Sequence, residues 1–206
     1  FHLPSRRAID PAAITDPSST RPRSDQERSQ ETAPKKALAM ATDLPALIPN
    51  LLTATDIESL EEIEHQHQHN SGAVRHTRSL SAAIGMKTLG VHKVRLTQGH
   101  YSTEFHTHLE DEEFIYILSG RATARIGALT REVSAGDFMG FEQNSQPHNL
   151  FNPHTEDLIY LVGGTNRDID ICDYPDLDLR QFRVHGERAA VSRSLLKPAN
   201  PQGKTS

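Results

Sequence analysis

The sequence predicts an all-β domain, a sandwich or barrel of jelly-roll type, with a polar segment at each end. Two observations favour this fold class. From Ala73 onward, short apolar segments suited to strands follow one another with glycine-containing turns between them. Helical spacing of apolar residues is confined to one short segment before that point. With 206 residues, the chain has room for one core plus tails.

Residues 1–39 are expected to be a disordered tail. They contain five prolines and many Ser, Thr, Arg and Gln residues, with almost no apolar clustering. Such a segment cannot bury enough apolar surface to offset its chain entropy. Its five acidic residues argue against a transit peptide, which is typically poor in acids. The sequence Met40-Ala-Thr-Asp would be a reasonable alternative start.

Residues 40–72 are expected to form an N-terminal arm with a short helix. Thr55-Asp56 could cap a helix whose apolar positions Ile57, Leu60 and Ile63 recur every three residues. The histidine-rich tract 65–72 follows directly. Alternating histidines could bind a metal if the tract were a strand, but a solvated helix end is the preferred interpretation.

The barrel itself is expected over residues 73–189. Candidate strands, each bounded by turn residues, are 91–97, 113–118, 121–126, 138–141, 148–152, 157–162, 168–172 and 181–184. Gly120, Gly127 and Gly136 are expected in turns, and Gly163-Gly164 is also interpreted as a turn. Residues 190–206 are polar and contain two prolines, so they are expected to be a flexible C-terminal tail.

Two of these strands are apolar on both faces. In 113–118, Ile115 and Ile117 share one face while Phe114 and Leu118 share the other, and 157–162 has the same character. Each strand therefore needs a cover on its second face. The segment 44–52 could supply it, and a second copy of the chain could do so equally well, so a homodimer is expected.

The overall composition limits the class of protein. The tail carries seven basic and five acidic residues, a net +2, and the whole chain carries −5, so residues 40–206 carry −7. This balance argues against nucleic-acid binding. No apolar run reaches the length of a membrane span, and Cys172 is the only cysteine, which excludes internal disulfides and thiol-based metal motifs. A soluble, cytoplasmic protein without a membrane partner is expected.

The segment from Gly99 to Gly120 contains a candidate metal site. His106 and His108 lie one residue apart, so in a strand their side chains point to the same face. Glu113 begins the next strand on the inward face, whereas Glu110, Asp111 and Glu112 fall in the connecting loop. Imidazole plus carboxylate suits manganese, iron, nickel or zinc, and His148 is a candidate for a third imidazole.

These residues resemble the two motifs of the cupin superfamily. The spacing His-x-His-x4-Glu-x6-Gly, preceded by Gly99, is similar to the first motif. Gly136-Asp137, Pro147-His148 and Asn152 are similar to the second, although Glu142-Gln-Asn144 replaces its Pro-x-Gly turn. The resemblance covers about residues 85–165. It implies a small single-domain cupin, with an RmlC-like double-stranded β-helix and His106, His108, Glu113 and His148 as metal ligands.

Two classes of function remain open at this stage. Four protein ligands would leave coordination positions free for a substrate, so the resemblance implies a small metal-dependent oxygenase, isomerase or lyase acting on an oxygen-rich small molecule. The alternative is a non-catalytic small-ligand or sugar-binding cupin with a structural metal. The fold alone does not choose between them.

The other candidate residues receive a structural interpretation. The histidines without a partner at ligand spacing are expected to be ordinary surface or core residues: His76, His92, His100, His154 and His185. Cys172 is expected to be a small buried residue. No nucleophile elbow or phosphate-binding glycine loop is present, and no general base distinct from the metal ligands is evident.

Overall fold

The structure is a computed structural model that describes residues 50–197. The expectations for the tail 1–39, for Met40 as a start, and for the last nine residues lie outside the described part of the chain. Within the described part, the helices are too short and too polar to cross a membrane. The predicted all-β class is confirmed, because antiparallel sheets account for most of the described residues.

The largest sheet has six strands in the order β1-β2-β3-β10-β5-β8. These strands are β1 (Ile63–His67), β2 (Asn70–Ser79), β3 (Leu89–Leu96), β5 (Glu113–Ser119), β8 (Phe138–Phe141) and β10 (Leu158–Thr165). All of their pairings are antiparallel. Two short helices, α1 (Ala54–Ser59) and α2 (Leu80–Ala83), precede β1 and β3.

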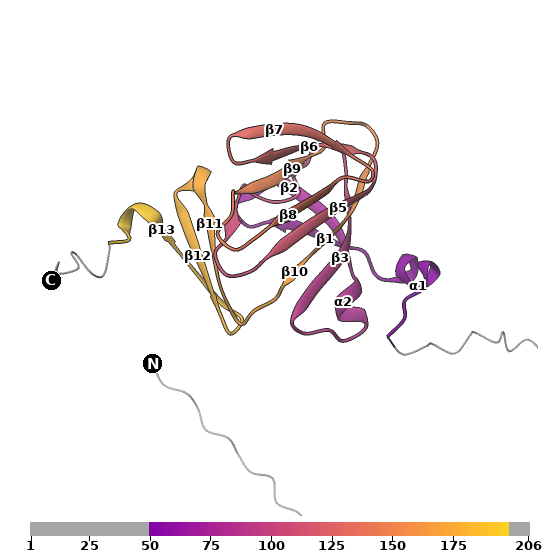
Figure 1. The fold of residues 1–206 in the computed structure, drawn as a ribbon, viewed down its shortest axis with the longest axis horizontal. Coiled ribbons are helices and arrows are strands. Elements are labelled where there is room, and N and C mark those ends of the chain that lie inside the picture. Colours follow the sequence, from indigo (N-terminus) through magenta and orange to yellow (C-terminus); the bar gives the residue numbers. More distant parts are fainter. Residues whose placement is uncertain (1–49, 198–206) are drawn as a thin grey trace, which may run out of the picture. The chain divides into compact units, whose positions relative to one another are not determined.

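Two smaller sheets complete the domain. One has the order β7-β6-β9, formed by β6 (Arg121–Ile126), β7 (Leu129–Ser134) and β9 (His148–Phe151). The other has the order β13-β12-β11-β4, formed by β4 (Thr107–His108), β11 (Ile169–Tyr174), β12 (Leu179–Val184) and β13 (Glu187–Ser192). Figure 1 shows β11, β12 and β13 together at one end of the domain.

The core lies between the six-stranded and three-stranded sheets. On β3, β5 and β10, alternate residues point inward and are fully buried, among them Val94, Ile117 and Tyr160. Ala122, Ala124 and Leu150 close the core from the opposite sheet. This alternation is the period-two pattern of a sheet with one face packed on a core.

The helix and the histidine tract differ from the expectation. Thr53, rather than Thr55, caps α1, and its side chain and that of Asp56 each bind the other's backbone N–H. The helix ends at Ser59, and the prediction of a helix end in the histidine tract is wrong, because His65, Gln66 and His67 belong to strand β1. Pairing with β2 provides hydrogen bonds and cross-strand contacts that the short helix could not offer.

The interpretation of Gly163-Gly164 as a turn is wrong. Both glycines lie inside β10 and pair with β3 and β5. Glycine is required there by close approach: a Cβ atom on Gly164 would collide with the carbonyl oxygen of Glu112, and one on Gly163 would lie 2.6 Å from the Phe114 ring. In addition, β13 continues to Ser192, past the expected start of the tail at residue 190.

The outward face of the six-stranded sheet carries exposed apolar side chains. Tyr116 and Leu118 are about two-fifths exposed, and Phe138 is 65% exposed, with its ring stacked on that of Phe114. The inward residues Ile115 and Ile117 of the same strand are buried. The predicted two-faced character of this strand is therefore confirmed, while the predicted homodimer stays a prediction.

Candidate metal centre

His106 and His108 come from the segment that leads into and forms β4. His106 makes an antiparallel bridge to His148 at the start of β9, with the His148 N–H donating to the His106 carbonyl oxygen at 2.8 Å. His108 pairs with Cys172 on β11. The ring centroids of His106 and His108 are 4.9 Å apart, and those of His106 and His148 are 4.8 Å apart. The three imidazoles thus meet at one end of the core.

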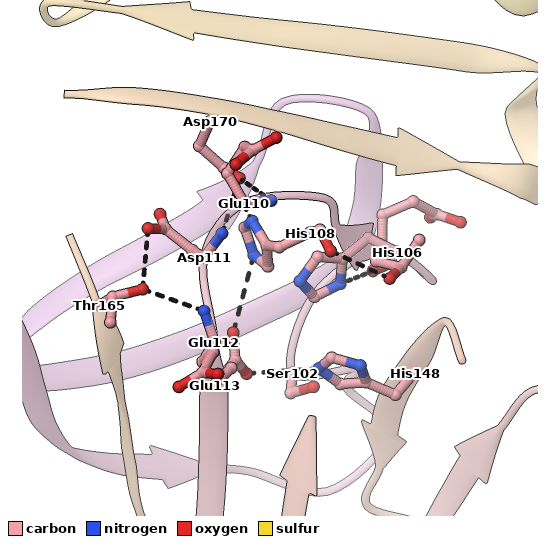
Figure 2. Close-up of polar contacts among 12 residues, drawn as sticks. Ser102, His106, His108, Glu110, Asp111, Glu112, Glu113, His148, Thr165 and Asp170 are labelled. Atoms are coloured by element: carbon pink, nitrogen blue, oxygen red, sulfur yellow. Dashed lines mark hydrogen bonds and ion pairs between the residues drawn. The ribbon is translucent and has the colours of Figure 1, made fainter. Parts of the chain in front are cut away.

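Glu113 is the acidic residue whose carboxylate meets these rings. Its Oε1 lies 3.4 Å from His148 Nε2 and its Oε2 lies 3.7 Å from His108 Nε2 (Figure 2). Of the three acidic residues in the preceding loop, Glu110 and Glu112 are exposed, and Asp111 is buried against the Arg183 guanidinium. Strand parity therefore selects the carboxylate that the structure brings to the imidazoles.

Neighbouring groups fix the orientation of each imidazole. His106 Nδ1 donates to the Glu104 carbonyl oxygen at 2.9 Å, and His108 Nδ1 lies 2.6 Å from Asp170 Oδ2 (Figure 2). Both contacts leave Nε2 available to the cluster. The His148 ring lies flat against Phe141, with centroids 3.4 Å apart. A carboxylate or carbonyl behind an imidazole is the usual support of a metal-binding histidine.

The electrostatics of the cluster follow from its burial. Burial, with the neighbouring imidazoles, lowers the pKa of His106 to about 3. Burial alone would raise the pKa of Glu113, but the contact with His148 and the charges of the three histidines lower it to about 2. Burial would also lower the pKa of His108, but the hydrogen bond to Asp170 raises it instead. His106 is therefore neutral and Glu113 ionised at pH 7.

The donor set fits a divalent cation. The ligand atoms of His106, Glu113 and His148 all lie within 4.8 Å of one another, and a second such group joins His106 and His108 to Cys172. Neutral imidazole nitrogens and one carboxylate are ligands for transition metals of intermediate softness. The cluster is therefore able to hold a metal ion.

The cluster opens into a cavity of about 380 Å³. Further polar residues line this cavity; they are Arg75, His92, Asp170, Tyr174, Arg183 and Arg188, together with His65 and His67 of the histidine tract. His92 was expected to be an ordinary histidine, yet it lies on the inward face of β3, directly across from Val162. His92 lies near Glu113 because β3 and β5 both pair with β10, and this pairing cannot be predicted from a local sequence motif.

Cys172 also faces the cavity, as does Tyr174 two residues later on β11. The thiol is buried, as expected, and burial raises its pKa to about 12. It is therefore protonated at neutral pH in the absence of a metal.

Comparison with known proteins gives the same fold. The family model for the cupin domain matches residues 92–164. A putative sugar phosphate isomerase from Acidithiobacillus ferrooxidans is 35% identical, with a TM-score of 0.71; the match covers 73% of this chain and 96% of that chain. A sugar phosphate isomerase of the cupin superfamily from Silicibacter pomeroyi is 24% identical, with a TM-score of 0.62, and the match covers 71% and 96% of the two chains.

No match is found among curated proteins. The resemblance seen in the two histidine-containing motifs is nevertheless confirmed. The protein from Acidithiobacillus ferrooxidans is 35% identical to this chain over 96% of its own length. The region matched by the family model includes His106, His108, Glu113 and His148. On this evidence, the chain belongs to the cupin family.

Proposed function

We propose that this protein is a metal-dependent isomerase that interconverts the aldose and ketose forms of a phosphorylated sugar. The observation that carries the proposal is a single cavity that joins an imidazole–carboxylate cluster to a wall of polar and cationic side chains. The 35% identical relative described as a putative sugar phosphate isomerase supports the choice of isomerisation over oxygenation or lyase chemistry.

His106, His108, Glu113 and His148 would hold the cation, which is manganese, iron, nickel or zinc in this proposal. When bound, it would supply positive charge beside adjacent carbonyl and hydroxyl oxygens of the sugar, which stabilises enediolate character. Glu113 remains ionised because its pKa is about 2, so it neutralises one of the two charges at any physiological pH.

His92 is the group we assign to proton transfer. Isomerisation requires a base that takes the proton from C2 of the aldose and returns it to C1, while the hydroxyl proton passes from O2 to O1. His92 lines the cavity, and its Nδ1 is buried with no hydrogen-bond partner among the described residues. Burial and the nearby Arg75 charge lower its pKa, so the ring is neutral and able to accept a proton at pH 7.

The size and polarity of the cavity suit this substrate class. A volume of about 380 Å³ falls at the small end of the usual range for small-molecule sites. Buried donors and acceptors, including Thr77, Ser102 and Gln181, line it beside the charged groups. Such a wall can bind the many hydroxyl groups of a sugar, whereas an apolar substrate would leave these groups without partners.

The experiment that tests the proposal follows proton exchange at carbon. Metal-free protein is loaded separately with each of the four metals and incubated in D₂O with a panel of phosphorylated aldoses and ketoses. We expect interconversion of one pair, with deuterium appearing at C1 or C2 by NMR. Elemental analysis should show one metal per chain in the wild type and a loss in His106→Ala. His185→Gln, at a 72% exposed side chain, is the control.

A second outcome would support the non-catalytic cupin. If the protein binds stoichiometric metal and a sugar but exchanges no carbon-bound proton with any metal, the isomerase proposal is wrong and the binding alternative gains. If the wild type binds no metal, both the metal-dependent isomerase and the binding cupin with a structural metal are excluded.

A further inference from the structure

Two hairpins meet at the cavity, and each brings a pair of basic side chains. In β1–β2, His65 lies directly opposite Arg75 in the strand register. In β12–β13, Arg183 lies directly opposite Arg188. All four residues line the cavity. Directly opposed residues project from the same face of a strand pair, so each pair presents its two side chains together.

Contacts between the two hairpins hold these pairs near one another. Gln68, in the β1–β2 turn, donates through Nε2 to Gln181 Oε1 of β12 at 2.5 Å. The His67 ring packs against Tyr174 of β11, with centroids 5.5 Å apart. Arg188 is close enough to His67 to lower its pKa. Residues from both hairpins therefore surround one part of the cavity.

Two of the three arginines at the cavity have no carboxylate partner among the described residues. Arg183 contacts Asp111, but over residues 50–197 no carboxylate oxygen lies within 4 Å of the guanidinium groups of Arg75 or Arg188. Arg75 Nη1 donates to the Ser102 carbonyl oxygen at 2.5 Å, which carries no charge and leaves other N–H groups of the guanidinium available. The carboxylates of Glu113 and Asp170 also line this cavity, and they contact the histidines of the cluster rather than these arginines. The two guanidinium groups repel each other, and an anion between them would remove that cost.

His67 adds a neutral donor whose hydrogen is fixed by its surroundings. The backbone N–H of His69 donates to His67 Nδ1 at 3.2 Å, so a neutral ring carries its proton on Nε2. Burial, followed by the charges of His69, Arg75 and Arg188, lowers the pKa of His67 to about 4. The ring therefore offers an N–H group at pH 7 without adding to the charge.

We infer that Arg75, Arg188 and His67 form a binding site for a phosphate dianion, the phosphate group of the substrate. Planar guanidinium forks and ring N–H groups match the oxygens of phosphate, and the two unpaired charges equal those of the dianion. The identification of the anion as part of a sugar phosphate rests on the proposed function. The anion site itself depends only on the residues named here.

The test measures binding of inorganic phosphate to the metal-free full chain by calorimetry, which separates this site from the metal cluster. We expect saturable binding by the wild type. Arg188→Gln and Arg75→Gln should each weaken it about tenfold or more, because each removes a charge-assisted contact. The matched control is Arg121→Gln, at a half-exposed arginine whose partners are Glu132 and Glu156 and which lies outside the cavity lining.

Two results would overturn the inference: absence of saturable phosphate binding by the wild type, or equal phosphate affinity in Arg188→Gln, Arg75→Gln and the control. Arg188 is exposed, so its variant keeps the test decisive if Arg75→Gln fails to fold. Thermal melts of each variant check the fold.

Turnover separates this inference from the proposed function. If phosphate binds through the two arginines but no phosphorylated sugar is isomerised, the anion site stands and the isomerase proposal fails. If sugars are isomerised with a KM that neither arginine variant changes, the isomerase stands and the anion site fails. If both are correct, the arginine variants raise the KM for the phosphorylated sugar and leave the KM for the unphosphorylated sugar unchanged.

Discussion

Replacing Asp170 with asparagine is expected to weaken metal binding while preserving the fold. Asp170 is only 3% exposed, and its Oδ2 lies 2.6 Å from Nδ1 of His108. Its Oδ1 accepts the backbone N–H of Asp111 at 3.2 Å, a bond that an asparagine carbonyl can also accept. Asp170→Asn thus removes the negative charge behind His108 and keeps the hydrogen bond that holds the loop.

The expected magnitude follows from the role of this contact. The carboxylate raises the pKa of His108, which makes its Nε2 a stronger ligand, and it holds the ring toward Glu113. Loss of such a supporting group typically costs about 10- to 100-fold in metal affinity. That range corresponds to about 1.4–2.7 kcal/mol of binding free energy. The short distance and deep burial favour the upper half of the range.

The assay is a competition titration of metal-free protein against a chelator of known affinity, with the metal content measured by elemental analysis. Asp173→Asn is the matched control. Asp173 lies on the same strand and is 5% exposed, but it points away from the cluster and pairs with Arg180 at 2.6 Å. Equal metal affinity in Asp170→Asn and wild type, or an equal loss in Asp173→Asn, would refute the supporting role of Asp170.

Four further predictions concern other parts of the molecule. Folding lowers the pKa of His106 from 6.5 to about 3, so near pH 5 only the unfolded chain takes up the proton, which lowers the free energy of unfolding by about 2 kcal/mol. His106→Gln should therefore reduce the loss of Tm between pH 7 and pH 5 in metal-free protein. His92→Gln should lower kcat for isomerisation about 100-fold or more, with little change in KM. Gly164→Ala should lower the free energy of unfolding by about 1–3 kcal/mol in a denaturant titration. Phe138→Glu should convert the predicted homodimer to a monomer by light scattering.

Each of these predictions has a control and an outcome that contradicts it. His185→Gln, at an exposed histidine, should leave both the pH dependence and kcat unchanged. Gly90→Ala places a Cβ opposite Gly164 at ordinary contact distance and should cost less. Leu129→Glu, on β7, should not alter the mass. The first prediction is contradicted if His106→Gln leaves the pH dependence of Tm unchanged, and the second if His92→Gln keeps full activity. The third is contradicted if Gly164→Ala is as stable as the wild type, and the fourth if the wild type is a monomer.

Local pattern in the sequence was sufficient for much of the fold and for the cluster. Strands 121–126 and 138–141 were predicted with the bounds that the structure gives, because apolar alternation and flanking turns define them. Period-two geometry also selected Glu113 over its three acidic neighbours. These inferences depend only on residues close together in the chain.

The remainder depends on pairing between distant segments. Gly163 and Gly164 are typical turn residues, but close approach by Glu112 and Phe114 requires glycine within a strand. The histidine tract became β1 because β2 pairs with it. His92, Arg75 and Arg188 reach one cavity from three different strands, so no spacing in the sequence could have grouped them.

The cluster has a mechanical consequence because three of its four side chains come from three different sheets. His108 lies on β4 in the four-stranded sheet, Glu113 begins β5 in the six-stranded sheet, and His148 begins β9 in the three-stranded sheet. A cation bound there would act as a cross-link between sheets that otherwise meet through side-chain packing. Since the cation would bind only the folded arrangement, each tenfold increase of the free metal concentration above its Kd would add about 1.4 kcal/mol to the unfolding free energy. Removal of the metal by a chelator would then loosen the junction of the three sheets first.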